Sequence, residues 1–344
     1  MFFMVLRRKL AKIILAGTIA LGLSEKTNAN VFSMADQSIK NLEMVTVGNP
    51  GNAPDTRYQT PGYGAVPYSY NIGKYEVTAG QYCEFLNAVA QTDTYELYNP
   101  NMLSNEDGCQ INRIGSPGSY KYDVASYYAN RPVNYVSWGD AARFANWLTN
   151  SQPTGGQNIA TTEDGSYYLN GAMSGVDLLA VTRKTNGKYV IPSEDEWYKA
   201  AYYDSNKSGG AGYWNYSTIS DTAPNYEAPP GTNSINGSAN FNQSGLTDVG
   251  AYTTKPSISA YGTFDQGGNV WEWNSSVVGS SRSLRGGSFN YNPGDVLHAK
   301  FRTYDLPVDE HDNIGFRISE VPEPAALGLL ALGGIGFLGK RKKK

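Results

Sequence analysis

The chain contains few cysteines and histidines, the side chains that often bind transition metals or take part in nucleophilic catalysis. Its 344 residues include two cysteines, Cys83 and Cys109, and two histidines, His298 and His311. Two histidines offer few candidates for a multi-histidine metal centre or for the base of a Ser-His-Asp triad. The cysteines stand in no Cys-x-x-Cys or metal-ligand spacing. In an exported chain an even count permits one disulfide, and two plain buried thiols are the alternative.

The N-terminal apolar run is too short to cross a membrane. It covers Ile13–Leu23, whereas a transmembrane helix takes roughly 20 residues. Cations within residues 7–12 precede the run, and small or polar residues follow it up to Ala29. Residues 1–29 are therefore predicted to be a cleaved signal peptide rather than a retained anchor.

The C-terminal end has the pattern of a second targeting signal. Val321-Pro-Glu-Pro324 leads into the apolar run Ala325–Gly339, and Lys340–Lys344 are five consecutive cations. A short transmembrane helix can just be held by such a run, with the cations kept in the cytoplasm. Residues 320–344 resemble the PEP-CTERM sorting signal of bacterial surface proteins. The resemblance implies an exosortase-type enzyme as a partner that cuts near the motif, and a permanent anchor is the alternative.

Few basic residues lie between the two predicted targeting segments. Taking five cations from each end leaves 18 of the 28 Lys+Arg in residues 30–339, and losing Glu25 leaves 30 of the 31 Asp+Glu, a net charge of −12. An acidic domain repels phosphate backbones, so no nucleic-acid partner is expected. The same negative charge favours the binding of divalent cations. The 26 tyrosines and 38 glycines suit a loop-rich extracellular module.

Three helix starts follow from capping patterns. Thr78-Ala-Gly-Gln81, Ser137-Trp-Gly-Asp140 and Ser193-Glu-Asp-Glu196 each place a hydroxyl three residues before a polar side chain. An apolar stripe at helical spacing follows the first two starts, and Trp197 with a pair of alanines follows the third. The sequence therefore predicts three helices, of which the third runs to about Tyr203.

The rest of the chain predicts short strands and long loops. Residues 73–77 and 188–191 are strand-like, and each enters one of the predicted helices. The stretches 150–175 and 204–245 are rich in glycine, asparagine and serine without a sustained period, which is typical of surface loops. The fold class predicted from these patterns is one irregular α+β domain of low regular secondary structure, covering residues 30–319.

Five ordered blocks carry a family resemblance. They are Arg131-Pro-Val-Asn-Tyr-Val-Ser-Trp138, Ile191-Pro-Ser-Glu-Asp-Glu-Trp-Tyr198, Gly267-Gly-Asn-Val-Trp-Glu-Trp273, Leu284-Arg-Gly-Gly-Ser-Phe289 and Gly315-Phe-Arg317. In this order they resemble the sulfatase-modifying, formylglycine-generating enzyme family, whose fold is a variant of the C-type-lectin-like fold. The resemblance runs from about Asn41 to Ile318 and implies that fold here.

The resemblance also implies that the known catalyst of the family is missing. Members carry two cysteines, five residues apart, after Gly-Gly-Ser, and these bind copper. Tyr291 and Val296 stand at the matching positions, so no catalytic residue and no copper are expected. A related branch uses non-haem iron with histidines from a helical domain that this chain lacks, so iron is not expected either. A binding or structural module is predicted, with a divergent metal-dependent oxidase or oxidoreductase of the family as the alternative.

Calcium is the cofactor that the tryptophan-rich block predicts. On a strand, Trp271 and Trp273 share one face and Glu272 lies on the other. A buried carboxylate needs a strong partner, and Ca²⁺ is one. A salt bridge from Glu272 to an arginine such as Arg285 is the alternative. The resemblance implies two calcium sites, whose candidate ligands here are Gly267, Gly268, Val270 and Glu272 in one and Asn240 and Phe241 in the other.

Loop aromatics are the candidates for recognition. Tyr291, His298 and Tyr304 are predicted to bind a ligand, because aromatic faces on loops suit sugars or peptides. Packing of the loops is the alternative role for these side chains. The predicted protein is exported to the periplasm, cell surface or extracellular matrix, and its partners there are extracellular polysaccharide or surface proteins.

Three arginines near the end of the domain have two possible roles. Arg285, Arg302 and Arg317 follow the tryptophan-rich block, in the region that lines the substrate cleft of the enzyme family. Structural pairing with acidic residues is predicted for them rather than an action on substrate.

Overall fold

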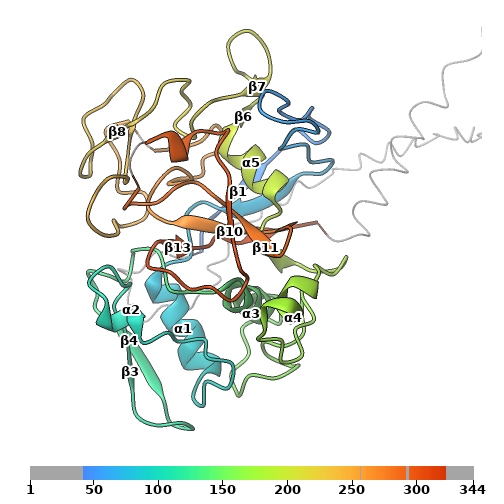
Figure 1. The fold of residues 1–344 in the computed structure, drawn as a ribbon, viewed down its shortest axis with the longest axis vertical. Helices are drawn as coiled ribbons and strands as arrows, with labels where there is room; N and C mark the ends of the chain where they lie inside the picture. The colour runs from blue at the N-terminus through green and yellow to red at the C-terminus, as the bar shows by residue number, and fades with distance from the viewer. Residues whose placement is uncertain (1–41, 256, 292–293, 323–344) are drawn as a thin grey trace, which may run out of the picture.

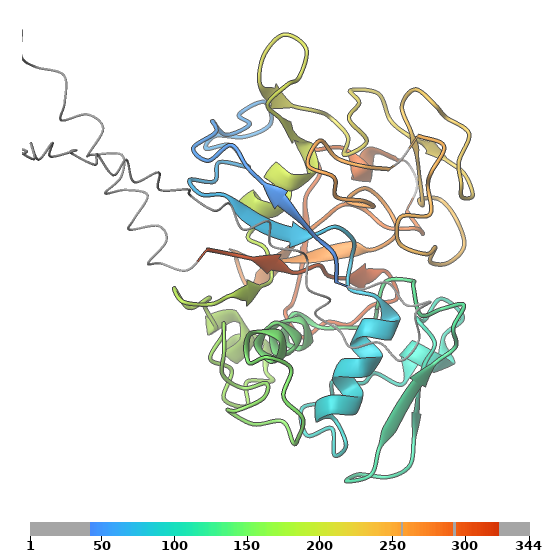
Figure 2. The same ribbon diagram turned by 180° about the vertical axis from the view of Figure 1, so that it is seen from behind.

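The computed structural model describes residues 42–255, 257–291 and 294–322. Its two four-stranded sheets lie between two unlike halves (Figure 1). One half holds α1 to α4 and the hairpin of β3 and β4, and the other holds α5 and long loops, as the view from behind also shows (Figure 2). The predicted signal peptide 1–29 and the apolar tail with its cations lie outside the described residues. Within the described residues, no helix is long and apolar enough to cross a membrane.

The elements are short. The helices are α1 (Ala79–Val89), α2 (Asn101–Ser104), α3 (Trp138–Thr149), α4 (Gly175–Ala180) and α5 (Glu194–Tyr202), with a 3-10 turn at Gly294–Leu297. The strands are β1 (Met44–Val47), β2 (Tyr70–Gly73), β3 (Ile111–Ile114), β4 (Lys121–Val124), β5 (Tyr189–Val190), β6 (Tyr203–Asp204), β7 (Gly212–Tyr213), β8 (Asn225–Tyr226), β9 (Ser238–Ala239), β10 (Trp271–Val278), β11 (Ser281–Arg285), β12 (Thr303–Asp305), β13 (Ile314–Gly315) and β14 (Ser319–Glu320). This is an irregular α+β domain of low regular secondary structure, as predicted.

Two four-stranded sheets organise the domain. The first has the order β1-β2-β14-β5 and the second the order β12-β11-β10-β13. In the second sheet β10 pairs antiparallel with β11, which sets Glu272 opposite Arg285, and parallel with β13, which sets Trp271 opposite Ile314. The segment Trp271–Glu272 thus lies in the interior of the sheet.

The predicted helix starts are confirmed. Thr78, Ser137 and Ser193 are the N-caps of α1, α3 and α5, and each forms a reciprocal capping box with the polar side chain three residues on. A capping box satisfies two backbone N–H groups that the first turn leaves without partners. The third helix ends at Tyr202, one residue before the predicted end.

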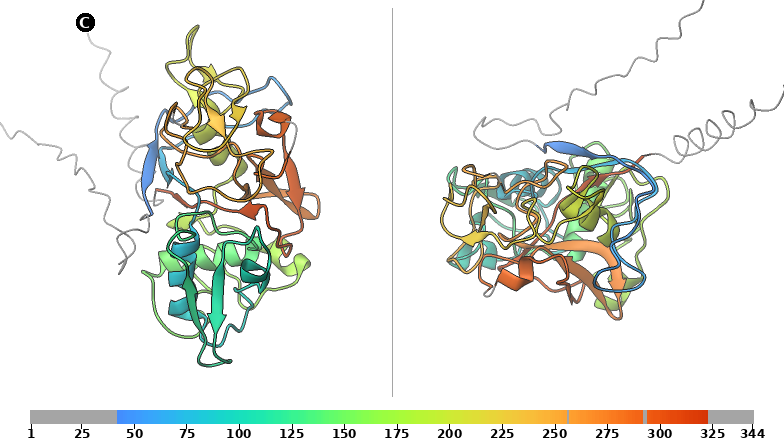
Figure 3. Two further views of the ribbon diagram at one scale, coloured as in Figure 1. Left: turned by 90° about the vertical axis from the view of Figure 1, so that its left-hand side faces the viewer. Right: turned by 90° about the horizontal axis from the view of Figure 1, so that it is seen from above.

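One predicted strand is wrong. Residues 73–77 were expected to form it, but β2 covers Tyr70–Gly73 and ends where the prediction began. After Gly73 the chain bends at residues 74–75, and the regular strand ends there although the N–H of Lys74 still donates to Glu43 O at 2.8 Å. The N–H of Val77 then donates to Phe316 O at 2.9 Å. The strand expected at 188–191 is present as β5. The stretch 204–245 is mostly loop with two-residue strands, gathered at the end opposite the β3–β4 hairpin (Figure 3).

Aromatic side chains bind the helices to the sheets. Phe144 of α3 contacts Tyr82 and Phe85 of α1 and Phe316 beside β13, with ring centroids 5.3 to 6.1 Å apart. Stacked and edge-to-face pairs of this kind add about 1 kcal/mol beyond the area they bury. The helical stripes seen in the sequence are therefore core.

The two cysteines are buried free thiols. Cys83 lies in α1. Burial raises the pKa of Cys83 to about 12 and that of Cys109 to about 11. Since the thiolate is the reactive form, neither side chain offers a nucleophile or a soft metal ligand near neutral pH.

Candidate functional site

A cavity of about 240 Å³ lies against the β12-β11-β10-β13 sheet. Each of the four strands contributes a lining residue: Trp271 from β10, Leu284 from β11, Thr303 from β12 and Ile314 from β13. The strand register explains this grouping, because Leu284 pairs with Thr303 and Trp271 with Ile314. The cavity is thus built on the part of the sheet that the family-like blocks form.

Two tyrosines stand at this cavity with their rings in solvent. Tyr291 is 43% exposed and Tyr304 is 58% exposed, and both line the cavity with the buried Trp271. The ring of Tyr291 meets that of Trp271 edge-on, with centroids 5.6 Å apart. Both tyrosines were singled out from the sequence as loop aromatics. Tyr304 instead lies in β12, and the structure places both at one cavity.

Polar groups complete the lining. Asp305, His311, Asp312 and Asn313 come from β12 and the segment that leads to β13. Asn313 is fixed there, because its carbonyl accepts from the N–H of Trp271 at 2.8 Å. The sequence analysis did not propose these four residues. A signal was nevertheless present, since acidic residues and one histidine are dense between positions 305 and 312.

The far end of the long loop holds the Tyr291 segment in place. The N–H of Asn242 donates to Tyr291 O at 3.0 Å, and that of Gln243 to Phe289 O at 2.8 Å. These bonds join the stretch 204–245 to the segment that carries Tyr291. Backbone anchoring of this kind leaves the tyrosine side chain free for contacts outside the fold.

His298 is not among the residues that line this cavity. Its ring lies edge-on between Tyr58 and Tyr216, with centroids 5.4 and 5.1 Å away. Its Nδ1 accepts from the N–H of Lys300 at 3.0 Å. Burial, with a smaller contribution from Lys300, lowers the pKa of His298 below its usual value. A neutral, half-buried histidine between two tyrosines has the environment of a packing residue.

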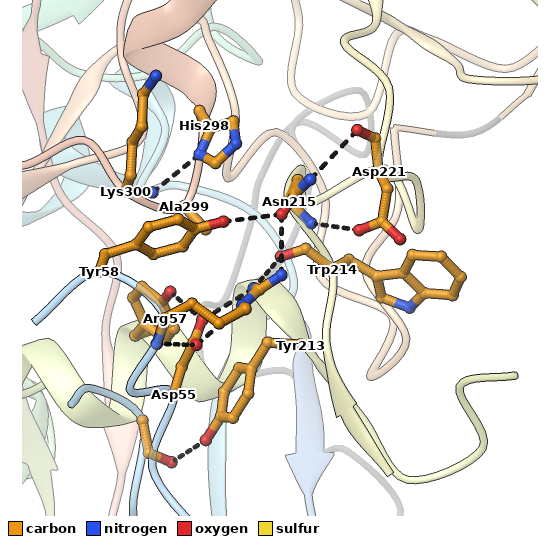
Figure 4. A network of polar contacts seen from close by, with 12 residues as sticks. Asp55, Arg57, Tyr58, Tyr213, Trp214, Asn215, Asp221, His298, Ala299 and Lys300 are labelled. Carbon is orange, nitrogen blue, oxygen red and sulfur yellow. Dashed lines mark hydrogen bonds and ion pairs between the residues drawn. The ribbon is translucent and has the colours of Figure 1, made fainter. Parts of the chain in front are cut away.

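A polar network anchors the His298 loop (Figure 4). The N–H of Ala299 donates to the carbonyl of Asn215 at 2.8 Å. The side-chain oxygen of Asn215 accepts from Tyr58 Oη at 2.8 Å and from Arg57 Nη1 at 2.9 Å. Arg57 also holds the buried Asp55 through Nε and Nη2. The network ties together segments near residues 57, 215 and 299, so its role is to fix the loops.

Tyr291 and Val296, which match the cysteine positions of the enzyme family, have different surroundings. Tyr291 is exposed at the cavity, whereas Val296 lies buried in the 3-10 turn Gly294–Leu297. A Cβ on Gly287 would meet Val296 Cγ2 at 2.9 Å, so this valine is packed tightly against the glycine pair. The two positions therefore do not present a common pair of reactive groups.

The carboxylate of Glu272 is fully engaged in the core. Its Oε1 accepts from Arg317 Nη2 at 2.6 Å, and its Oε2 accepts from Arg317 Nε at 2.5 Å and from Trp197 Nε1 at 2.7 Å. An ion pair was the alternative to calcium, and it is present with Arg317 instead of Arg285. Three donors on one carboxylate fit an ion pair rather than a Ca²⁺ ligand.

The second predicted calcium position has a different character. Asn240 is buried, and its Oδ1 has no hydrogen-bond partner among the described residues. Gly268 adopts φ +98°, and a Cβ there would lie 2.5 Å from Asn240 O, so the close approach requires glycine. An orphaned amide oxygen is an acceptor that Ca²⁺ can use. Calcium therefore stays a prediction, with Asn240 as the ligand that the contacts favour.

The three arginines pair with acidic residues, as predicted. Arg285 Nε lies 2.8 Å from Glu194 Oε1, and Arg302 Nη2 lies 2.7 Å from Glu194 Oε2. Arg317 pairs with Glu272. The sequence did not single out Glu194 as the shared acceptor, although it belongs to the capping pattern at the start of α5.

These observations define an α+β frame locked by buried ion pairs, with an aromatic cavity on one of its sheets. The sequence matches the model of the sulfatase-modifying factor enzyme 1-like domain over residues 28–320. The chain therefore belongs to this family. No curated protein matches the chain.

Several solved structures are similar to the chain. Variable protein 1 of Treponema denticola is 20% identical with a TM-score of 0.50, and the match covers 81% of this chain and 95% of that protein. CarF is 20% identical with a TM-score of 0.47, covering 82% and 98%. PvdO from Pseudomonas aeruginosa is 18% identical with a TM-score of 0.41, covering 81% and 92%. At this identity the likeness to the Treponema protein shows the fold alone.

The C-terminal end matches a second model. Residues 320–343 match the PEP-CTERM protein-sorting motif. This motif implies an exported protein that is sorted to the cell envelope and processed by an exosortase-type enzyme. The sequence prediction for this tail is thereby confirmed at the level of the motif.

Proposed function

We propose that the protein is a cell-envelope binding module whose ligand occupies the cavity at Tyr291 and Tyr304. The observation that carries the proposal is the position of these two residues. Both present partly exposed rings at one cavity over the sheet. The family resemblance matches Tyr291 to the position of a catalytic cysteine. A recognition surface in the place of a catalytic one fits a domain that has kept the family frame and changed its use.

An extracellular polysaccharide is the ligand class that the lining fits best. Tyrosine rings offer flat apolar faces to the C–H faces of sugar rings. The carboxylates of Asp305 and Asp312 and the amide of Asn313 offer acceptors and donors to hydroxyl groups. Ligand sites commonly combine an aromatic lining with a few placed polar groups in this way. The sorting motif places such a domain in the cell envelope, where polysaccharide is abundant.

The alternative, a divergent oxidase or oxidoreductase, finds no support in the cysteines. Copper chemistry of the family type needs accessible thiolates, and burial keeps Cys83 and Cys109 in the thiol form. Copper or iron bound in stoichiometric amount, together with formylglycine formed on a sulfatase peptide, would establish the alternative.

Binding to polysaccharide extracted from the native host's surface tests the proposal. Tyr304→Ala should weaken binding about tenfold or more, as expected for the loss of a stacking residue worth about 1.5 kcal/mol. Its melting temperature should stay close to that of the wild type, because the ring is largely in solvent. Tyr127→Ala is the matched control, since Tyr127 is 70% exposed and lies outside the cavity lining.

Two results would contradict the proposal. One is equal loss of binding in the Tyr304→Ala and Tyr127→Ala variants, which would mean that no particular tyrosine recognises the ligand. The other is unchanged polysaccharide binding in both Tyr304→Ala and Tyr291→Ala. Capture of a surface protein through the same tyrosines would keep the cavity and replace the ligand class.

A further inference from the structure

Three potential metal ligands converge beside the cavity. Asp305, Asp309 and His311 each offer one ligand atom, and these atoms all lie within 4.8 Å of one another. His311 Nε2 is 3.3 Å from Asp305 Oδ2. The imidazole separates this set from a merely acidic cluster, because it adds a nitrogen donor to two carboxylate oxygens. One nitrogen and two oxygens are a ligand set that suits first-row divalent metals such as Zn²⁺.

Backbone pairing holds these residues together, and the N–H of Leu306 donates to Asp305 Oδ1 at 3.0 Å and to Asp309 Oδ2 at 3.3 Å. Asp305 lies in β12, opposite Arg282 of β11. The carbonyl of His311 accepts from the N–H of Tyr135 at 3.0 Å, which ties the other end of the segment to the chain before α3. Asp309 lies between the two anchors. The ligand atoms are therefore positioned before any ion arrives, which lowers the cost of ordering a site.

Space for the remaining coordination positions is present on both sides of the segment. Asp305 and His311 line the cavity of about 240 Å³, and Asp309 and His311 line a second cavity of about 760 Å³. His311 belongs to both linings, so the three ligand atoms lie on the ridge between the two spaces. Water or a ligand can therefore reach an ion at this position from either cavity.

Beyond His311, which lies beside Asp305, the carboxylates at this ridge have no ion-pair partner among the described residues. Among the described residues, no lysine or arginine forms an ion pair with Asp305 or Asp309. The buried acids Glu194 and Glu272 contrast with them, because each is held by arginine. Two adjacent carboxylates repel one another unless a cation or a proton lies between them.

We propose that Asp305, Asp309 and His311 bind one divalent transition-metal ion between the two cavities. The proposal goes beyond the polysaccharide assignment and does not depend on it, because the three side chains define the site by themselves. The bound ion leaves open coordination positions toward both cavities, as expected for a site with three protein ligands.

Zinc alone is the probe that tests this site. Full-length protein freed of metal with a chelator is titrated with Zn²⁺ by calorimetry, and its melting temperature is measured with and without the ion. The wild type should bind one ion per chain and melt about 5 °C higher in a hundredfold excess of Zn²⁺ over the dissociation constant. His311→Ala and Asp309→Asn should each weaken binding at least tenfold.

The second histidine of the chain provides the control. His298→Ala should bind Zn²⁺ as the wild type does, because His298 lies in the Tyr58 and Tyr216 environment away from the ridge. A melting curve recorded in chelator verifies that each variant is folded. If His311→Ala does not fold, Asp309→Asn is used in its place. No Zn²⁺-dependent shift in the wild type, undiminished binding by His311→Ala, or equal weakening by His298→Ala would each overturn the site. Polysaccharide binding is measured separately, so failure of one proposal is distinguishable from failure of the other.

Discussion

The Glu272 region and the cavity rim differ in how far their side chains are buried. Glu272, Arg317 and Trp197 are fully buried, and both oxygens of the carboxylate are engaged. At the rim, Tyr291 and Tyr304 keep exposed rings. The first region belongs to the sequence blocks that match the family. The second lies outside those blocks.

This difference separates the buried residues that stabilise the fold, here called the frame, from the cavity residues proposed to bind the ligand. Buried charges must be paired to be tolerated, so a frame built on them accepts few substitutions. Residues at an open cavity contribute little to stability and are free to change with the ligand. The family's cysteine position that Tyr291 occupies lies on the open side of this division. A substitution at this position is therefore compatible with the fold.

The largest expected effect comes from breaking the buried ion pair. Arg317→Met leaves the Glu272 carboxylate buried without its main partner, which should lower the free energy of unfolding by about 3–5 kcal/mol. Lys74→Met breaks the half-exposed pair with Glu43 and should cost less than about 1 kcal/mol. Urea unfolding of both variants measures the contrast. Similar losses in the two variants would mean that the buried pair is not the anchor of the frame.

Calcium binding should have the next largest effect. Ca²⁺ added to chelated protein should stabilise it by about 2.7 kcal/mol at a hundred times the dissociation constant, because it binds the native state. Asn240→Ala should remove this gain, since the orphaned Asn240 Oδ1 is the expected ligand. The gain should survive in Arg317→Met. A wild type that melts at the same temperature with calcium and with chelator would end the calcium prediction.

A smaller effect concerns a carboxyl that the frame leaves poorly paired. Glu76 is fully buried, Arg317 Nη2 is 3.9 Å from its Oε2, and burial raises its pKa well above the usual value of 4.5. The folded state therefore holds a proton that the unfolded state releases. The stability from this proton is complete below about pH 4.5 and is lost as the pH rises toward the folded-state pKa.

Glu76→Gln should accordingly gain about 1 kcal/mol over the wild type at pH 8, because the amide is neutral at every pH. The gain should disappear near pH 4.5, where the wild-type carboxyl is also neutral. Glu43→Gln, at a half-exposed carboxylate, is the control and should show little pH-dependent gain. Unfolding free energies at the two pH values decide the matter, and a variant less stable than the wild type at pH 8 would refute the assignment.

Local signals in the sequence predicted the frame well. The capping boxes at Thr78, Ser137 and Ser193 are local patterns, and each starts a helix. Pairing of the three arginines with acids also followed, because buried guanidinium groups need carboxylates. The identity of the partners did not follow. Glu272 pairs with Arg317, which is 45 residues away, and only the packing of β13 beside β10 brings them together.

The candidate site was predictable only in part. Tyr291 and Tyr304 were singled out by residue type, but their meeting at one cavity depends on the pairing of β11 with β12. His298 was grouped with them as an aromatic residue of a loop, and the structure places it between Tyr58 and Tyr216. Periodicity gives no information about contacts between loops, since those depend on the sheet to which each loop returns.

The division between frame and cavity is tested most directly by measuring polysaccharide affinity and unfolding free energy together in Tyr304→Ala and Glu272→Gln. Tyr304→Ala should lose at least tenfold in affinity and less than about 0.5 kcal/mol in stability. Glu272→Gln should lose stability through the Arg317 pair and, while folded, bind polysaccharide as the wild type does. Affinity within twofold of the wild type in Tyr304→Ala, or binding lost in folded Glu272→Gln, would contradict the account.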